Sequence, residues 1–145
     1  MKTLLNSELD NGVIALIDEM PMRRAEIAAF LADWAVQARM RVTLRDLSAQ
    51  DDLTNDGTSI RMMIVSVGGD TLSRSRALPF IINQGKAGHD IPIVVLSDRS
   101  ARREIELAFQ AGAQGYIPST TEPGLALQAL TFILNGGHYF PSVAL

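Results

Sequence analysis

The stretch that decides the fold reads VIALIDEMP and runs from Val13 to Pro21. Its five consecutive apolar residues are too few for a helix, and two acids end the run. Such a run predicts a strand that is buried on both faces of a parallel sheet. Pro21 suits the first turn of a helix, where its missing N–H leaves no hydrogen bond unmade. The stretch therefore predicts a strand followed by a helix, the repeating unit of α/β folds.

The same alternation continues along the chain. Further strands are predicted at 42–47, 62–67, 91–96 and 115–117. Helices are predicted to begin at Pro21, Leu72, Ser100 and Pro123, with at most a short one within 48–59. We therefore expect an α/β fold with one mostly parallel sheet that helices cover on both faces.

Apolar periodicity assigns a core-facing side to the longer helices. In the first helix this side comprises Ile27, Phe30, Leu31, Trp34, Ala35 and Ala38. In the helix that Ser100 is expected to cap, Ile105, Ala108 and Phe109 share one face. Pro79 is predicted to kink or interrupt the helix that begins at Leu72.

Length and composition narrow the class of protein. The 145 residues suit one domain, and an apolar share of 47% rules out global disorder. The absence of cysteine excludes a disulfide framework, a thiolate zinc site and a cysteine nucleophile. A net charge of −3 gives no reason to expect that this segment binds nucleic acid by itself. Since neither a signal peptide nor a membrane span is evident, we expect a soluble, cytoplasmic domain with no membrane partner.

Two adjacent acids follow the first predicted strand, at the end where open parallel sheets bind ligands. Asp18 and Glu19 offer carboxylate oxygens, which Mg²⁺ prefers as ligands. The alternative interpretation is structural, because negative charge at the start of a helix suits the helix dipole. Arg23 and Arg24 follow closely and could neutralise the two acids without a metal.

Three segments carry a family resemblance: DEMP at 18–21, IVVLS at 93–97 and AGAQGYIP at 111–118. Together they resemble the receiver domain of two-component response regulators, in the branch where the receiver precedes a LuxR/NarL-type helix-turn-helix domain. The resemblance implies a doubly wound, five-stranded parallel sheet with strand order 2-1-3-4-5. It places a receiver-like domain at 12–137, after an N-terminal extension at 1–11. Residues 138–145 would begin a linker to a helix-turn-helix domain outside this chain.

The resemblance also assigns site residues. In that family a histidine kinase transfers a phosphoryl group to an aspartate at the end of the third strand, beside Mg²⁺ held by an acidic pair. Carried over, the acidic pair falls on Asp18 and Glu19. The hydroxyl switch falls on Ser97, and the aromatic switch falls on Tyr116.

Two functional positions depart from the family. The phosphoacceptor position falls on Ser66, which has no carboxylate and cannot form an acyl phosphate, and the lysine position falls on Ser119. We therefore predict a pseudo-receiver that is not an enzyme and requires no cofactor; the lost third carboxylate argues against Mg²⁺.

Two alternatives stay open. One is a phosphorelay receiver that uses Asp70 or Ser66 as a displaced acceptor, and the other is a small α/β ligand- or nucleotide-binding protein that uses the loop at 68–69.

The last predicted helix is apolar around most of its surface. Leu127, Leu130 and Leu134, with Leu107 of the preceding helix, are therefore predicted to contact a second copy of the chain. We expect a homodimer that serves as a signal-input module for transcription regulation. A histidine kinase or another signalling protein is the expected upstream partner, and DNA would be reached only through a C-terminal domain outside this chain.

Overall fold

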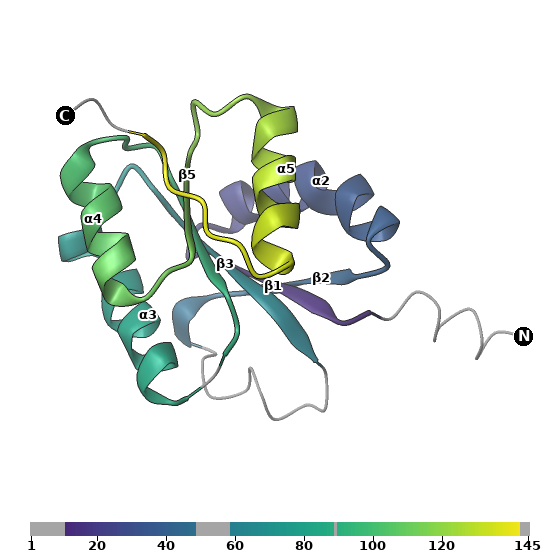
Figure 1. The fold of residues 1–145 in the computed structure, drawn as a ribbon, viewed down its shortest axis with the longest axis horizontal. Helices are drawn as coiled ribbons and strands as arrows, with labels where there is room; N and C mark the ends of the chain where they lie inside the picture. Colours follow the sequence, from purple (N-terminus) through teal and green to yellow (C-terminus); the bar gives the residue numbers. More distant parts are fainter. Residues whose placement is uncertain (1–10, 49–58, 89, 143–145) are drawn as a thin grey trace, which may run out of the picture.

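The computed structural model describes residues 11–48, 59–88 and 90–142, which fold around one five-stranded parallel sheet (Figure 1). The strand order is β2-β1-β3-β4-β5, so the predicted α/β class and strand order are both confirmed. The strands are β1 (Val13–Ile17), β2 (Arg41–Arg45), β3 (Ile60–Gly68), β4 (Ile93–Ser97) and β5 (Gly115–Pro118). β1 is buried along its whole length, as the VIALI run predicts.

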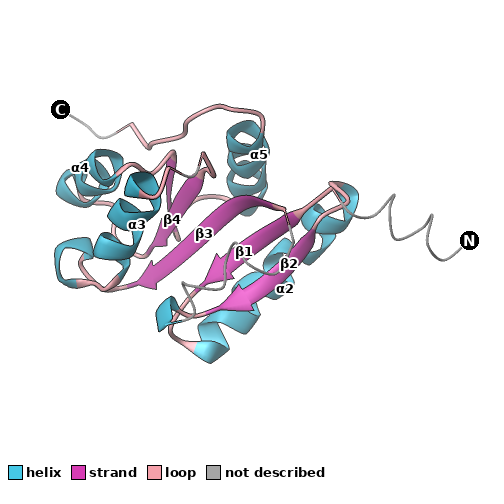
Figure 2. Ribbon diagram, turned by 90° about the horizontal axis from the view of Figure 1, so that it is seen from below, coloured by secondary structure: helices cyan, strands magenta, loops and turns pink. Residues whose placement is uncertain are grey.

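Four α-helices and one 3-10 helix lie wholly within the described residues. They are α2 (Pro21–Gln37), η2 (Leu72–Arg74), α3 (Ala77–Lys86), α4 (Arg102–Ala111) and α5 (Pro123–Leu134). The helices α2 and α5 lie on one face of the sheet, and α3 and α4 lie on the other (Figures 1 and 2). Because all neighbouring strands are parallel, their carboxyl ends lie at one edge of the sheet.

Alternate residues of each strand point to opposite faces and build two cores. On the α2–α5 face, Ile14 of β1 packs with Leu31 of α2 and Leu130 of α5. On the α3–α4 face, Ile17 of β1 belongs to the same cluster as Tyr116 of β5. The two faces therefore meet different helices, and a side chain at the end of a strand belongs to one face or the other.

The chain from Leu72 forms two elements, whereas the sequence predicted one helix with a break at Pro79. The 3-10 helix ends at Arg74, Ser75 is extended, and α3 begins at Ala77. The Ala77 N–H donates to Oγ of Ser75 over 3.0 Å. Pro79 therefore lies in the first turn of α3, where a proline removes no helical hydrogen bond, and it neither kinks nor interrupts the helix.

Two aromatic residues predicted for the core lie at the surface instead. Phe30 of α2 is 41% exposed and Phe109 of α4 is 60% exposed. Phe109 packs edge-on against Phe140, with ring centroids 5.4 Å apart, so a contact outside its own helix decides its position. The predicted cap of α4 is also wrong, because the N-cap position falls on Ala101 and Ser100 precedes it.

The segment after α5 returns to the sheet. The Tyr139 N–H donates to the Gln114 carbonyl over 3.0 Å, and the Tyr116 N–H donates to the Tyr139 carbonyl over 2.9 Å. Gly115 and Tyr139 form an isolated parallel bridge. This segment therefore lies along the outer edge of β5.

Some expectations fall outside the described residues. These are nearly all of the extension at 1–11, nearly all of the short helix within 48–59, and the end of the proposed linker at 143–145. None of the helices in the described ranges is long and apolar enough to cross a membrane.

Candidate functional site

The buried carboxylate of Asp18 is bound by Arg23. Asp18 directly follows β1 and has a fully buried side chain, and Arg23 reaches it from the first turn of α2. Arg23 donates Nε to Oδ2 and Nη2 to Oδ1, both over 2.7 Å, and the Met20 N–H also donates to Oδ1. This is the planar two-pronged pairing that a guanidinium makes with a carboxylate. The charge of Asp18 is therefore balanced by a residue of the protein itself.

The electrostatic surroundings of Arg23 favour its charged form. The hydrogen bond to Asp18 raises the pKa of Arg23 above its ordinary value, although burial alone would lower it. The carboxylates of Asp98 and Asp70 raise the pKa further. The Arg23 guanidinium thus lies near three aspartates and supplies positive charge to this site.

The second member of the predicted acidic pair has a different partner. Glu19 forms a 3.1 Å ion pair with Arg76, and both side chains are well exposed. Arg24, predicted to neutralise an acid, instead donates Nη1 to the backbone carbonyls of Asp18 and Arg45. The expected pairing of an arginine with an acid is therefore confirmed for Arg23 and Asp18 but is wrong for Arg24.

The residues present do not fit a divalent cation. Both carboxylate oxygens of Asp18 are engaged by the guanidinium of Arg23. Across the part of the chain that the structure describes, no group of three acidic, histidine or cysteine residues is placed to hold a metal ion. We therefore assign no chemistry at this site to Mg²⁺.

Gly68 makes room for the guanidinium. It ends β3 with φ +56°, in the left-handed region that favours glycine, and a Cβ built on it would overlap Nη1 of Arg23. The neighbouring Gly69 lacks this restriction, since its Cβ would approach only Asp98, at 3.9 Å. The position of Arg23 on Asp18 therefore depends on glycine at residue 68.

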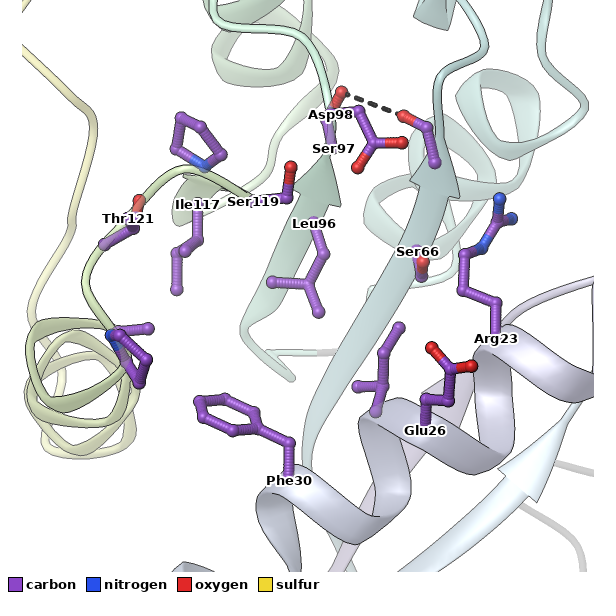
Figure 3. A pocket seen from close by; sticks show the side chains of 15 residues that line it. Arg23, Glu26, Phe30, Ser66, Leu96, Ser97, Asp98, Ile117, Ser119 and Thr121 are labelled. Atoms are coloured by element: carbon purple, nitrogen blue, oxygen red, sulfur yellow. Dashed lines mark hydrogen bonds between the residues drawn. The ribbon is translucent and has the colours of Figure 1, made fainter.

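Three serines lie at the ends of consecutive strands, as the sequence predicted. Ser66 on β3 and Ser97 on β4 are buried, whereas Ser119 just after β5 is exposed. Ser97 Oγ donates to the Gly68 carbonyl over 3.4 Å and accepts from the Arg99 N–H over 3.0 Å. The Ser119 N–H donates to the Ser97 carbonyl over 2.7 Å. All three serines line the same cavity (Figure 3).

Tyr116 is buried and connects β5 to the loop after β4. Its hydroxyl donates to the Arg99 carbonyl over 2.7 Å, and Nε of Arg99 donates to the Gly69 carbonyl over 2.7 Å. Burial raises the pKa of Tyr116, with a smaller rise from Glu104; hydrogen bonding to Ser97 and the charge of Arg99 act in the opposite direction. Tyr116 and Ser97 thus hold the same loop, a connection through Arg99 that the sequence did not reveal.

We expect Tyr116→Phe to lower the free energy of unfolding by about 1 kcal/mol near neutral pH, because it removes the hydrogen bond to Arg99. The raised pKa adds a pH dependence. Above about pH 10 the unfolded chain loses this proton before the folded protein does, so stability falls as the pH rises toward the folded-state value. The phenylalanine variant should lack this part of the alkaline loss.

Urea titrations at neutral pH and at stepwise higher pH measure both effects. Tyr139→Phe, at a half-buried position, is the control for loss of a phenolic hydroxyl elsewhere. If the free energy of unfolding fell equally at high pH in the wild type and in Tyr116→Phe, burial would not be raising the pKa of Tyr116 as we infer.

The cavity above the strand ends has a volume of about 410 Å³ and lies between α2 and α5. Ser66, Arg23 and Asp98 contribute polar groups, while Phe30 and Ile117 contribute apolar ones. The exposure of Phe30, unexpected from the sequence, is explained by this cavity, because the ring forms part of its wall.

The residues predicted to contact a second copy differ in burial. Leu130 is only 2% exposed and belongs to the core on the α2–α5 face, so it cannot contact a second copy. Leu127 and Leu134 pack against that core, and Leu107 packs against the other. The exposed apolar side chains of α5 are Leu125 and Phe132. The homodimer itself stays a prediction.

The solved structures that this chain resembles include response regulators and their receiver domains. A LuxR family DNA-binding response regulator from Silicibacter pomeroyi matches with a TM-score of 0.72 at 22% identity, over 90% of this chain and 97% of that one. A LuxR family two-component response regulator from Aurantimonas sp. SI85-9A1 gives 0.73 at 18% identity, over 88% of each chain. The isolated REC domain of RcsB from Salmonella enterica serovar Typhimurium gives 0.72 at 13% identity, over 92% of this chain and 95% of that one.

No family model and no curated protein matches the sequence. At these low identities, the likeness to solved structures establishes the receiver fold. The chemistry has to be argued from the residues of this chain.

Proposed function

We propose that this chain is a pseudo-receiver, a non-enzymatic signal-input module that keeps the receiver fold and works without phosphorylation. The observation that carries the proposal is the two-pronged pairing of Arg23 with the buried Asp18. The carboxylate that would help to hold a metal is already neutralised, and the neighbouring acceptor position is Ser66. Two requirements for forming an acyl phosphate are therefore missing together.

The chemistry of Ser66 supports the same conclusion. A serine hydroxyl is a weak nucleophile unless a base removes its proton. The residues that share its cavity include no histidine, and among the described residues neither of the cavity's carboxylates, Glu26 and Asp98, is hydrogen-bonded to Ser66. The nearby carboxylate of Asp18 is hydrogen-bonded to Arg23 and to the Met20 N–H, so it is poorly placed to act as that base.

The loops that would respond to a phosphoryl group are held by the protein's own groups. Tyr116 is packed inward with its hydroxyl on the Arg99 carbonyl, and Arg99 reaches the Gly69 carbonyl. The Asp98 N–H donates to the Gly68 carbonyl over 2.8 Å. We infer that the signalling state of this edge is set by binding events and not by covalent modification.

The experiment is incubation with acetyl phosphate and Mg²⁺, followed by intact-mass measurement. The chain is expected to gain no phosphate, while a receiver domain that has the acceptor aspartate, treated in parallel, gains one. Ser66→Asp tests directly whether the pairing of Arg23 with Asp18 prevents phosphorylation. This variant is also expected to stay unmodified, because Arg23 still binds the Asp18 carboxylate.

One rival is supported by a specific observation. Asp70 is exposed and lines a small cavity together with Asp18 and Ser66, so it is the candidate for a displaced acceptor. Stoichiometric addition of phosphate to the wild type, lost in Asp70→Asn or Ser66→Ala, would replace the pseudo-receiver proposal by a working phosphorelay receiver.

The proposed partners follow from the same proposal. A second copy of the chain, bound through the side of α5 that carries Leu125 and Phe132, would make the module a homodimer. A histidine kinase or another signalling protein would act upstream. One neighbour in fold is a DNA-binding response regulator, which supports transcription regulation through a DNA-binding domain as the output.

A further inference from the structure

The cavity between α2 and α5 has the size and shape of a small-molecule site. Its volume of about 410 Å³ lies within the range of known ligand pockets, about 300–1,000 Å³. Exposed residues such as Phe30 and Asp98 form part of its wall, so it is open to solvent. It also contains Ser66 and Ser97, and an occupant would therefore touch the strand ends that the proposed function treats as the signalling edge.

One side of the cavity is apolar. Phe30 of α2 and Ile117 of β5 point into it from opposite walls (Figure 3), and Ile27 and Ala126 also line the cavity. Phe30 is 41% exposed although it is large and apolar, and burying such a ring is worth about 2 kcal/mol. This side therefore favours an aromatic or aliphatic body.

The other side is acidic. Glu26 lies beside Arg23 on α2, and Asp98 lies above Ser66 (Figure 3). Among the described residues neither Glu26 nor Asp98 forms a salt bridge. The one guanidinium of the lining, that of Arg23, is paired with Asp18. Arg23 also attracts Asp98 at longer range, without a salt bridge. The polar side of the cavity thus has two carboxylates, Glu26 and Asp98, and one guanidinium that is already bound to a third carboxylate.

We propose that this cavity binds a small cationic amphiphile, an amine with an apolar body. The ammonium group lies on the acidic side, near Glu26 and Asp98, and the body lies against Phe30 and Ile117. An anionic ligand of the same shape binds more weakly, because its charge would face the two carboxylates. That such a ligand is the input signal rests on the proposed function; that the cavity binds it does not.

The test compares two probes of matched shape, 4-phenylbutylamine and 4-phenylbutyrate, by titration calorimetry and by backbone amide shifts in heteronuclear NMR. The amine is expected to bind at least about tenfold more tightly than the carboxylate, which corresponds to about 1.4 kcal/mol. The largest shifts are expected at Ser66, Ser97 and Ser119, which line the cavity.

Matched variants separate the two sides of the site. Glu26→Gln/Asp98→Asn should abolish the preference for the amine, whereas Asp33→Asn/Asp90→Asn, which neutralises two exposed acids outside the cavity, should keep it. Phe30→Ala should weaken both probes several-fold. The control Val36→Ala, at an exposed position farther along α2, should weaken neither.

Equal or tighter binding of the carboxylate would overturn the proposal, as would shifts confined to the opposite end of the sheet, or no binding of the amine up to its solubility limit. Intact-mass measurement on the same preparation keeps the two proposals apart. If the chain is phosphorylated and binds the amine, the pseudo-receiver proposal is wrong and the proposed ligand site is kept. If the chain stays unmodified and does not bind the amine, only the proposed ligand site is wrong.

Discussion

Replacement of Arg23 by alanine is expected to lower the free energy of unfolding by about 3 kcal/mol, because it leaves the Asp18 carboxylate buried without its cation. The remaining partner of that carboxylate is the Met20 N–H, which cannot balance a full charge. Burying an unpaired charge costs far more than losing one ordinary hydrogen bond. Urea unfolding followed by the fluorescence of Trp34, the only tryptophan, measures the change.

The sign of the pH dependence follows from Arg23. Its pKa is raised in the folded protein, so its contribution is fully present below the ordinary arginine value and is lost only as the pH rises through the higher folded-state value. Across neutral and mildly alkaline conditions the contribution is therefore constant. A difference between wild type and Arg23→Ala that vanished between about pH 7 and 9 would contradict the assignment.

Two further variants sharpen this test. Arg76→Ala breaks the exposed pair with Glu19 and should change stability by less than about 0.5 kcal/mol. Arg23→Lys keeps the charge but cannot make the two parallel hydrogen bonds, so we expect it to recover only part of the loss. A loss in Arg76→Ala as large as that in Arg23→Ala would mean that burial of Asp18 is not the cause.

Replacement of Gly68 by alanine is expected to cost about 3 kcal/mol through two effects. An alanine at φ +56° is strained by about 1 kcal/mol. Its Cβ would also overlap Nη1 of Arg23, so the guanidinium would have to leave its position on Asp18. The second effect breaks the same pairing of Arg23 with Asp18 that Arg23→Ala removes, so the two variants share part of their loss of stability. Gly69→Ala is the matched control and should lie within about 0.5 kcal/mol of the wild type, since its Cβ has room.

A double-mutant cycle checks that the two effects are linked. If alanine at residue 68 acts mainly by displacing Arg23, the double variant should be only about 1 kcal/mol less stable than Arg23→Ala alone, because just the backbone strain is left to add. Strict additivity of the two losses would show that Gly68 and Arg23 act independently.

The fold was readable from sequence wherever a local pattern decides the structure. The run at Val13–Ile17 is buried throughout, and Pro21 and Pro123 each begin a helix, because both features act within a few residues. Phe109 shows the limit. Its spacing within the helix fits the core face, but its ring packs on Phe140. Phe140 lies outside α4, so the periodicity of α4 could not predict this contact.

The candidate site could also be predicted only in part from the sequence. Strand ends in a parallel sheet meet at one edge, so the meeting of Ser66, Ser97 and Ser119 followed from their positions after predicted strands. The partners of long side chains did not follow. Arg99 stands close in sequence to Arg102 and Arg103, a pattern that is typical of a solvated helix face, yet it reaches the Gly69 carbonyl. Such contacts depend on how the loops are placed, and this is settled only when the whole sheet has formed.

The return of the chain along β5 limits how two copies can meet. Tyr139 bonds to the backbone of Gln114 and Tyr116, so donors and acceptors of the outermost strand that a neighbouring molecule could otherwise use are already taken. Unprotected strand edges invite sheets to grow from one molecule into the next. On this flank, association through a continuous intermolecular sheet is disfavoured, and contact must be made by side chains.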